Sequence, residues 1–311
     1  MGSTLCKRLI SEGNRVICLD SLVTGRLANI SELIGRRDFR FIRQDVIKPI
    51  SIEGPLDEIY NLACPASPNK YERDPVHTFR TSIFGAENVL QLAAAKKARV
   101  LQASTSEVYG DPELSPQPES YRGSVNTFGP RACYDEGKRG AETLFYEYGI
   151  HRGVETRIAR IFNTYGPQMA ADDGRVVSNF IVQALTGQPL TIYGTGEQTR
   201  SFCYVDDLVD GLIRLMRAPE GSKMPVNLGN PGEFTVKELA QMVLEKTGAK
   251  LPLVHFDLPK DDPRQRRPDI GLAGALLGWA PTVPLSEGLD RTIAYFRSEI
   301  DQEGMPREME A

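Results

Sequence analysis

The segment Gly2-Ser-Thr-Leu-Cys-Lys-Arg-Leu9 places its apolar residues at helical spacing, and the short apolar run Val16-Ile-Cys-Leu-Asp20 follows it. The same alternation continues through the first half of the chain. Strands are expected at residues 15–19, 39–42, 58–62, 100–103 and 156–162, and helices at 2–12, 76–97 and 131–148. Alternation of this kind is typical of βαβ units with parallel strands. The sequence therefore predicts an α/β fold with a doubly wound parallel sheet.

The second half of the chain is less regular. Helices are expected at residues 176–186, 206–216, 236–247 and 285–296, with turns rich in proline and glycine between them and a frayed, charged tail from residue 300. We predict a Rossmann-like nucleotide-binding domain over residues 1–167. A smaller C-terminal α/β substrate lobe is expected over residues 168–311, with some of its segments returning to the first domain.

Composition narrows the class of protein. The net charge of −4 argues against a nucleic-acid or membrane-surface partner, which usually requires a broad cationic face. Three scattered histidines and five cysteines without a C-x-x-C pair argue against a metal site, a disulfide framework or a Ser-His-Asp triad. The chain has no run of about 18 apolar residues and no basic-then-apolar leader, so we expect a cytoplasmic protein.

The N-terminal segment resembles part of a dinucleotide-binding loop. In such a loop, glycines let backbone N–H groups approach a pyrophosphate at a helix N-terminus. Gly2 matches the last glycine of that loop, whereas the first strand and the earlier glycines are absent from this sequence. Asp20 ends a strand where a carboxylate suits the ribose hydroxyls of NAD, although a turn residue would fit there equally well. Gln44-Asp45-Val46 and Asn61-Leu-Ala63 follow the next strands and are candidates for adenine and ribose contacts or for simple strand caps.

Tyr134 and Lys138 are the candidate redox pair. Their spacing of four residues puts both on one face of a helix, although this spacing alone arises easily by chance. A cation about 4 Å from the phenol would lower its pKa by up to about three units. We therefore expect the pKa of Tyr134 near neutrality, where general acid-base catalysis is most efficient.

Thr105-Ser106-Glu107 follows a buried strand and should lie at the carboxyl edge of the sheet, where ligands bind in open α/β folds. The alternative is a strand exit capped by hydroxyls. Arg175, Arg200 and Arg266 have guanidinium groups that suit diphosphate and carboxylate oxygens, although each would also be ordinary as a solvated surface residue. Residues 260–269, around Arg266, are expected to form an irregular loop facing the ligand.

Several longer motifs accompany these residues. They are Asn61-Leu-Ala-Cys-Pro-Ala-Ser-Pro68, Ser104-Thr-Ser-Glu-Val-Tyr-Gly-Asp111, Gly129-Pro-Arg-Ala-Cys-Tyr-Asp-Glu-Gly-Lys-Arg139, Arg160-Ile-Phe-Asn-Thr-Tyr-Gly-Pro167, Asp173-Gly-Arg-Val-Val-Ser-Asn-Phe180 and Gln198-Thr-Arg-Ser-Phe202. Together they resemble the extended short-chain dehydrogenase/reductase family and, within it, the UDP-glucuronic acid decarboxylases. The resemblance extends over residues 2–296.

This resemblance implies NAD as cofactor, a UDP-sugar as substrate and a homodimer in which helices 76–97 and 131–148 pair. It implies that Tyr134 is the base with Lys138 as its partner, that Thr105 and Ser106 lie at the sugar, and that Glu107 acts near C5. The residues implied to hold the substrate and its diphosphate are Arg80, Asn88, Asn163, Arg175, Arg200 and Arg266. Those implied to bind NAD are Gly2, Asp20, Ser21, Thr24, Gly25, Asp45, Val46, Leu62, Cys64, Thr81, Ala103, Tyr134 and Lys138.

The expected reaction is decarboxylation of UDP-glucuronate to UDP-xylose through a 4-keto intermediate. A 4,6-dehydratase is an alternative, but such enzymes place an Asp-Glu pair where this chain has Ser106-Glu107. A 4-epimerase is a second alternative, although it needs no carboxylate at position 107. A third is a nucleotide-sugar binding protein without turnover, which the shortened glycine loop would suit.

Overall fold

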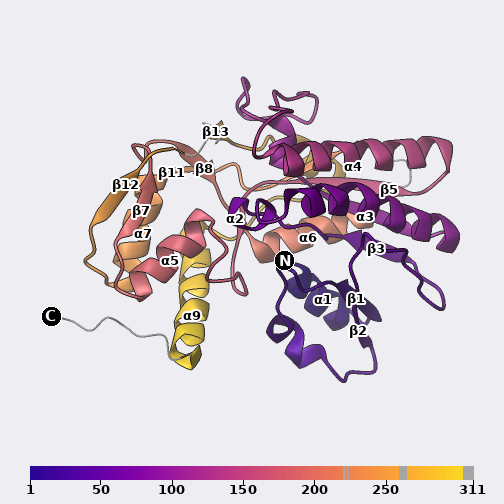
Figure 1. Ribbon diagram of the computed structural model, residues 1–311, viewed down its shortest axis with the longest axis horizontal. Coiled ribbons are helices and arrows are strands. Elements are labelled where there is room, and N and C mark those ends of the chain that lie inside the picture. The colour runs from indigo at the N-terminus through magenta and orange to yellow at the C-terminus, as the bar shows by residue number, and fades with distance from the viewer. Residues whose placement is uncertain (220–221, 223, 259–264, 304–311) are drawn as a thin grey trace.

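The computed structural model describes residues 1–219, 222, 224–258 and 265–303. The predicted alternation of strands and helices is confirmed in the first half of the chain (Figure 1). Its elements, in order, are α1 (Gly2–Ser11), β1 (Val16–Asp20), η1 (Leu27–Leu33), β2 (Phe39–Arg43), β3 (Glu58–Asn61), α2 (Pro68–Tyr71), α3 (Pro75–Lys96), β4 (Arg99–Thr105), η2 (Ser106–Tyr109), α4 (Ala132–His151), β5 (Thr156–Ile161) and β6 (Thr164–Tyr165).

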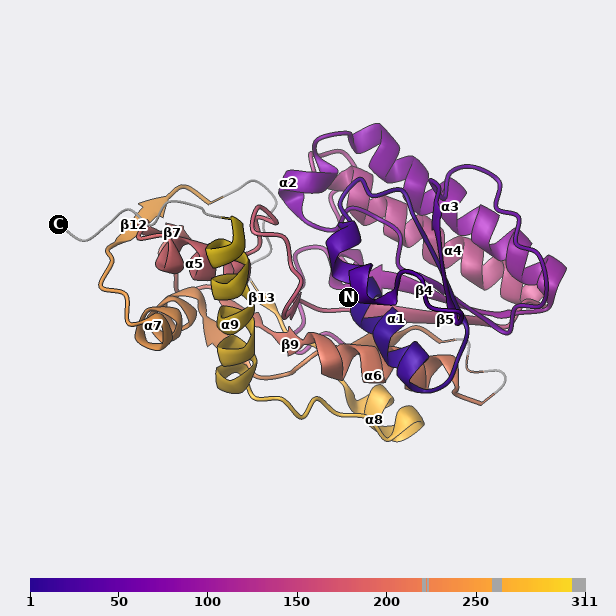
Figure 2. The ribbon, with the colours of Figure 1, turned by 90° about the horizontal axis from the view of Figure 1, so that it is seen from below.

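The strands of this half pair in parallel, but they belong to three sheets, one of which is the two-stranded pair of β6 with β9 (Cys203–Tyr204). β1 pairs with β2, while β3, β4 and β5 are joined by β10 (Val226–Leu228) in the order β10-β5-β4-β3. α3 and α4 pack together on one face of the larger sheet, and α6 (Val205–Met216) covers the other face (Figures 1 and 2). Because helices cover both faces, β4 is buried from Val100 to Thr105.

The rest of the chain forms a group of short strands and helices. Its elements are α5 (Val176–Leu185), β7 (Leu190–Tyr193), β8 (Thr199–Ser201), β9 (Cys203–Tyr204), β11 (Glu233–Thr235), α7 (Val236–Thr247), β12 (Leu253–Phe256), β13 (Gln265–Arg266), α8 (Gly271–Leu277) and α9 (Leu285–Glu303). Apolar side chains of α5, α7 and α9 share one core, in which Ile181, Leu239 and Leu289 are fully buried. These helices stand apart from α3 and α4 in both views (Figures 1 and 2).

Two expectations for the second half need correction. The loop expected over residues 260–269 contains the strand β13, which pairs with β8; residues 259–264 lie outside the described part of the chain. A two-residue strand has no periodicity that a sequence pattern can reveal. The last helix, α9, continues to Glu303, beyond the expected end at residue 296 and into the expected frayed tail. Its extra turns are stabilised because Ile300, within the helix, is buried.

The fold brings distant segments to one edge of the larger sheet. β4 ends at Thr105 and leads directly into η2, while α4 begins beside it at Ala132 and β13 arrives from the far end of the chain. The carboxyl ends of parallel strands lie at the same edge, so their following residues can converge. In residues 1–219, 224–258 and 265–303, no helix has the length and apolar character needed to cross a membrane.

Candidate active site

Tyr134 and Lys138 lie together at the end of β4. Both are buried, and the Lys138 Nζ is 5.8 Å from the centre of the Tyr134 ring. The ammonium donates a hydrogen bond to the backbone carbonyl of Ala103 at 2.8 Å. Tyr134 and Lys138 therefore share one face of α4, as the four-residue spacing predicts. The backbone near the end of β4 holds the Lys138 ammonium in place.

The predicted near-neutral pKa of Tyr134 is wrong for this structure. Burial raises the pKa of the phenol far above its usual value, the charge of Cys64 adds to the shift, and the neighbouring Thr105 hydroxyl opposes it. Burial also lowers the pKa of Lys138. The four-residue spacing predicts the attraction of the ammonium, but desolvation in the folded protein disfavours the charged forms of both side chains.

Tyr71 is an aromatic neighbour of the pair that the sequence analysis did not identify. Its ring stacks on that of Tyr134, with centroids 5.1 Å apart and planes 7° from parallel. Tyr71 is 1% exposed, and its hydroxyl oxygen is buried without a hydrogen-bond partner. The available signal was its position three residues after the motif that ends at Pro68. The stacked ring restricts the orientation of the Tyr134 phenol.

Glu107 is held by two arginines. Arg131, at the N-cap of α4, donates from Nη2 to the Glu107 Oε2 at 2.9 Å. Arg266, on β13, reaches both oxygens, with Nη1–Oε1 and Nη2–Oε2 distances of 2.5 Å. All three side chains are buried. Glu107 and Arg266 are site residues predicted from the sequence, but Arg131 is not. Its role depends on a contact with Glu107, which lies 24 residues earlier in the chain.

Asp135 is a second buried carboxyl near this group. Asp135 is 7% exposed, and within the described part of the chain its buried Oδ1 has no hydrogen-bond partner. Burial and the charge of Glu107 raise the pKa of Asp135 to about 7, while Arg131 and Arg266 oppose the shift. Asp135 was not predicted as a site residue, because its burial depends on the tertiary fold.

The predicted NAD residues lie at the start of α1, at or after the ends of β1 to β4, and on α3 and α4. Gly2 begins α1, and a Cβ atom built on it would meet only Leu62, at 3.9 Å. Asp20 ends β1, and its Oδ1 accepts a hydrogen bond from the backbone of Leu22 at 2.7 Å. The following turn folds back so closely that a Cβ at Gly25 would lie 3.1 Å from both carboxylate oxygens of Asp20. In the same turn, Ser21 is half-buried and Thr24 is exposed.

Four other predicted NAD residues lie on α3 or contact it, namely Asp45, Val46, Cys64 and Thr81. Asp45 contacts the His77 ring at 2.7 Å, and the Thr81 hydroxyl donates to the His77 backbone carbonyl. The Cys64 Sγ lies 3.4 Å from the Ser82 hydroxyl. Val46 accepts a hydrogen bond from the Asn88 side chain at 2.8 Å. Asn88, predicted to contact the substrate, thus lies beside a predicted cofactor residue.

The other predicted substrate residues are spread around the site. Arg175 pairs with Asp173 at 2.5 Å just before α5, and Arg200 is buried on β8, where it donates to the Thr199 carbonyl. Asn163 lies between β5 and β6, and its backbone carbonyl accepts from Cys203. Arg80 is exposed on α3. Arg266 is the predicted substrate residue that the structure brings directly to Glu107.

Comparisons with known proteins place the chain in a family. The model of the NAD dependent epimerase/dehydratase family matches residues 1–229. The chain belongs to this family. UDP-glucuronic acid decarboxylase 1 of Xenopus tropicalis is 52% identical over 303 residues, which cover 97% of this chain and 71% of that protein. UDP-glucuronic acid decarboxylase 3 of Arabidopsis thaliana is 53% identical over 302 residues, covering 97% and 87%. These identities confirm the resemblance seen in the motifs.

A solved structure confirms the Rossmann-like fold. UDP-glucuronic acid 4-epimerase from Bacillus cereus, in complex with UDP-glucuronic acid and NAD, superposes with a TM-score of 0.83 and 25% sequence identity, covering 96% of each chain. Family membership therefore rests on both sequence and fold, and the cluster around Tyr134 and Glu107 lies within the part of the chain that the family model matches, apart from Arg266.

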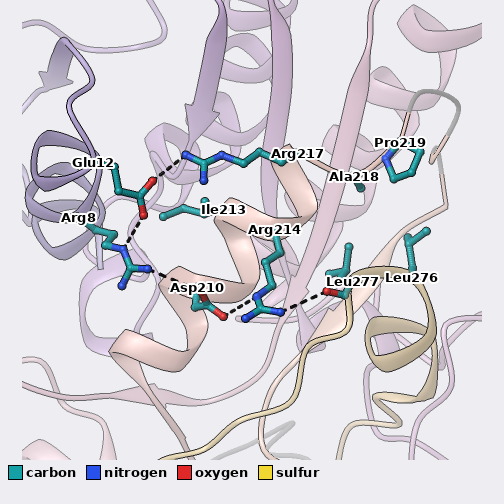
Figure 3. Close-up of a pocket in the computed structure, with 10 residues that line it drawn as sticks. All are labelled: Arg8, Glu12, Asp210, Ile213, Arg214, Arg217, Ala218, Pro219, Leu276 and Leu277. Atoms are coloured by element: carbon teal, nitrogen blue, oxygen red, sulfur yellow. Dashed lines mark hydrogen bonds and ion pairs between the residues drawn. The ribbon is translucent and has the colours of Figure 1, made fainter.

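A separate surface pocket of about 390 Å³ lies between α1, α6 and α8 (Figure 3). Its cationic side chains are already paired: Glu12 binds both Arg8 and Arg217, and Asp210 binds Arg214. None of its lining residues belongs to the cluster around Tyr134. We therefore assign the chemistry to the Tyr134 and Glu107 cluster.

The raised pKa of Asp135 predicts a pH-dependent stability. Between the unfolded value of 3.8 and the folded value of about 7, the folded protein binds the extra proton, so stability is lost as pH rises through this window. Asp135→Asn should therefore gain on the order of 1–2 kcal/mol relative to the parent between about pH 5.5 and about pH 8. Urea unfolding at both pH values measures this. Glu136→Gln, one residue along the helix, is the control, and an equal response of both variants would contradict the prediction.

Proposed function

We propose that this chain is an NAD-dependent carboxy-lyase that converts UDP-glucuronate to UDP-xylose and CO2 through a 4-keto intermediate. The observation that carries the proposal is a buried Glu107, clamped by two arginines beside Tyr134 and Lys138, in a chain about half identical to proteins named UDP-glucuronic acid decarboxylases. The domain division at residue 167 is part of the proposal, with the cofactor on the N-terminal side and most substrate contacts on the C-terminal side.

The residues present fit NAD. Gly2 offers the N-terminus of α1 without a side chain to block a phosphate, and the tight turn at Gly25 leaves the Asp20 carboxylate at the end of β1 for ribose hydroxyls. Cys64 lies just after the end of β3, and Lys138 lies on α4. NAD, when bound there, would accept the C4 hydrogen with its electron pair and later return them.

In the first step the phenolate form of Tyr134 would remove the proton of the C4 hydroxyl, and the positive charge of bound NAD+ would favour that form against the burial that raises the pKa of the phenol. Lys138 is oriented by the Ala103 carbonyl and supplies a positive charge beside the phenol, while Thr105 lies close enough to affect the Tyr134 pKa. Oxidation at C4 makes the ketone β to the C6 carboxylate. CO2 then leaves because the electrons of the broken C5–C6 bond enter an enolate. Protonation at C5 and reduction at C4 complete the reaction, in which one proton is consumed overall.

The principal alternative is a 4-epimerase, favoured by the likeness to the Bacillus cereus enzyme. Such an enzyme must keep the C6 carboxylate that a decarboxylase releases. The site has two guanidinium groups around the buried Glu107 carboxylate and a second buried carboxyl at Asp135. Inversion at C4 does not need so many charged groups. A 4,6-dehydratase needs an acid to expel the C6 hydroxyl, and Ser106 is a poor acid for that step.

Product analysis of purified protein with UDP-glucuronate and NAD tests the proposal. We expect CO2 and UDP-xylose in equal amounts, without net accumulation of reduced cofactor. UDP-galacturonate without CO2 would establish the epimerase instead, a 4-keto-6-deoxy product from a UDP-hexose would establish a dehydratase, and binding without product would establish a protein that holds nucleotide sugars without turnover.

Two substitutions separate the roles of Tyr134 and Glu107. Tyr134→Phe removes the base, so UDP-glucuronate should still bind while reduced nicotinamide no longer forms. Glu107→Gln leaves the first step intact, so reduced nicotinamide should still form while UDP-xylose falls by about 100-fold or more. Stopped-flow absorbance and titration calorimetry measure the two effects. Retained turnover in the first variant, or a complete block of oxidation in the second, would refute these roles.

We also propose that the chain forms a homodimer through α3 and α4 and that it works in the cytoplasm. α3 and α4 lie side by side on the outside of the sheet and expose the large apolar side chains Phe79, Phe84, Tyr146 and Ile150 (Figure 2). A second copy with the same surface would cover them. The five free cysteines suit a reducing compartment.

The dimer has a direct test in solution. Phe84 is 48% exposed on α3, so Phe84→Asp should place a charge in the interface and shift the protein to a monomer. Sedimentation velocity across a range of concentrations measures the mass. Leu114→Asp is the matched control, because Leu114 is 50% exposed but lies in the loop between η2 and α4. A parent protein that sediments as a monomer would refute the proposal.

A further inference from the structure

Asp135 is the buried ionisable group at the site for which the proposed mechanism so far has no use. It is one helical turn beyond Arg131 on α4, and its backbone N–H donates to the Arg131 carbonyl at 3.1 Å. Arg131 in turn donates to Glu107 at 2.9 Å. Asp135 and Glu107 are both 7% exposed. Two carboxyl groups are thus buried around the same pair of arginines.

Their hydrogen bonding differs. Glu107 accepts from both guanidinium groups, which favour its ionised form. The Asp135 Oδ1 is buried and has no hydrogen-bond partner among the residues that the structure describes. An ionised carboxylate left without partners in a buried site is costly, whereas the neutral acid tolerates burial far better. When two carboxyls lie near each other, their like charges raise the pKa of one of them. In this structure Asp135 is the member suited to carry a proton.

The reaction under Proposed function needs such a proton. When the C5–C6 bond breaks, its electron pair remains on the sugar and CO2 leaves without a proton. The new C5–H bond therefore requires one proton from outside the substrate. Both oxygens of Glu107 already accept hydrogen bonds or ion pairs from the guanidinium groups of Arg131 and Arg266. A neighbouring neutral carboxyl would supply the proton.

We propose that Asp135 stores the proton for C5 and delivers it through Glu107, a role that rests on the decarboxylase function proposed above. The enolate forms a C5–H bond as the O–H bond of Glu107 breaks, and Glu107 obtains that proton from Asp135, directly or through one water. Asp135 is then reprotonated from solvent. Each turnover consumes one proton, which matches the overall reaction. Asp135 is a positioning residue, because it acts through Glu107.

The surroundings of Asp135 support a proton at neutral pH. Burial comes first among the effects that raise its pKa to about 7, and Glu107 comes second. The charged and titratable groups that face it come from several elements, namely Arg131, Glu136, Tyr134 and Cys133 on or beside α4, Glu107 on η2, Tyr71 on α2 and Arg266 on β13. The arginines oppose the shift without cancelling it.

The test is the pH dependence of UDP-xylose formation together with the first-turnover release of CO2. In the parent protein, kcat for UDP-xylose should fall as pH rises above about 7, because the neutral form of Asp135 is required. Asp135→Asn should lower this kcat by about 100-fold and remove its alkaline limb. KM, formation of reduced nicotinamide and the first-turnover burst of CO2 should remain, because these precede protonation at C5.

Two further variants exclude a merely structural role. Asp135→Glu keeps a carboxyl and should retain an alkaline limb, with kcat partly restored. Glu136→Gln should behave as the parent, since Glu136 lies one residue along the helix and faces Arg139 at 3.5 Å. The inference is overturned by a parent profile that stays flat between about pH 6 and about pH 9, or by Asp135→Asn with a parent-like rate and limb. A variant that loses oxidation and CO2 release as well would also overturn it.

The same experiments distinguish the inference from the function on which it rests. If the parent protein makes UDP-xylose and CO2 but Asp135→Asn is unchanged, the decarboxylase assignment stands and the role of Asp135 is lost. If the parent releases no CO2 from UDP-glucuronate, both are lost.

Discussion

The burial of the Glu107 carboxylate is the constraint on which the site depends. A charge removed from water must be compensated, and here the compensation comes from two guanidinium groups on distant parts of the chain. Arg131 is fixed by the start of α4, and Arg266 is fixed by the pairing of β13 with β8. Removal of either arginine would leave a buried charge undercompensated, at a cost of about 3–5 kcal/mol for a fully buried pair. The ion pair between Arg266 and Glu107 therefore also joins the second half of the chain to the first.

The parallel sheet explains why so many polar groups meet at this place. β3, β4 and β5 all end at the same edge of the sheet. Thr105 is the last residue of β4, and Cys64 and Asn163 come shortly after β3 and β5, so all three lie at this edge. α4 packs against β4 and β5 and adds the Tyr134 phenol and the Lys138 ammonium. The hydrogen bond from Lys138 to Ala103 ties helix and strand together at the point where the chemistry is expected.

Local patterns predicted much of this arrangement. The helices and strands of the first half, the doubly wound fold and the common helix face of Tyr134 and Lys138 follow from periodicity and spacing, because these depend on neighbours along the chain. Tyr71, Arg131 and Asp135 were missed because their importance comes from contacts made only after folding. The pKa of Tyr134 was wrong for the same reason: the spacing contains the ammonium, but the burial of the phenol is a property of the whole site. The separation of β1–β2 from the larger sheet likewise has no local signal.

Decarboxylation and epimerisation share the oxidation at C4, and so the Tyr134 and Lys138 pair cannot distinguish them. They differ at C5. Decarboxylation breaks the C5–C6 bond and leaves its electron pair on the sugar, and a proton must then add at C5. The groups that matter for specificity must then lie at C5 and must control a proton rather than an electron pair. A carboxylate paired with two arginines, beside a carboxyl whose pKa burial raises to about 7, is an arrangement with that property. In the mechanism that we propose, these two tasks would be separate: β4 and α4 would position the groups for hydride transfer, and the charged groups around Glu107 would supply the proton.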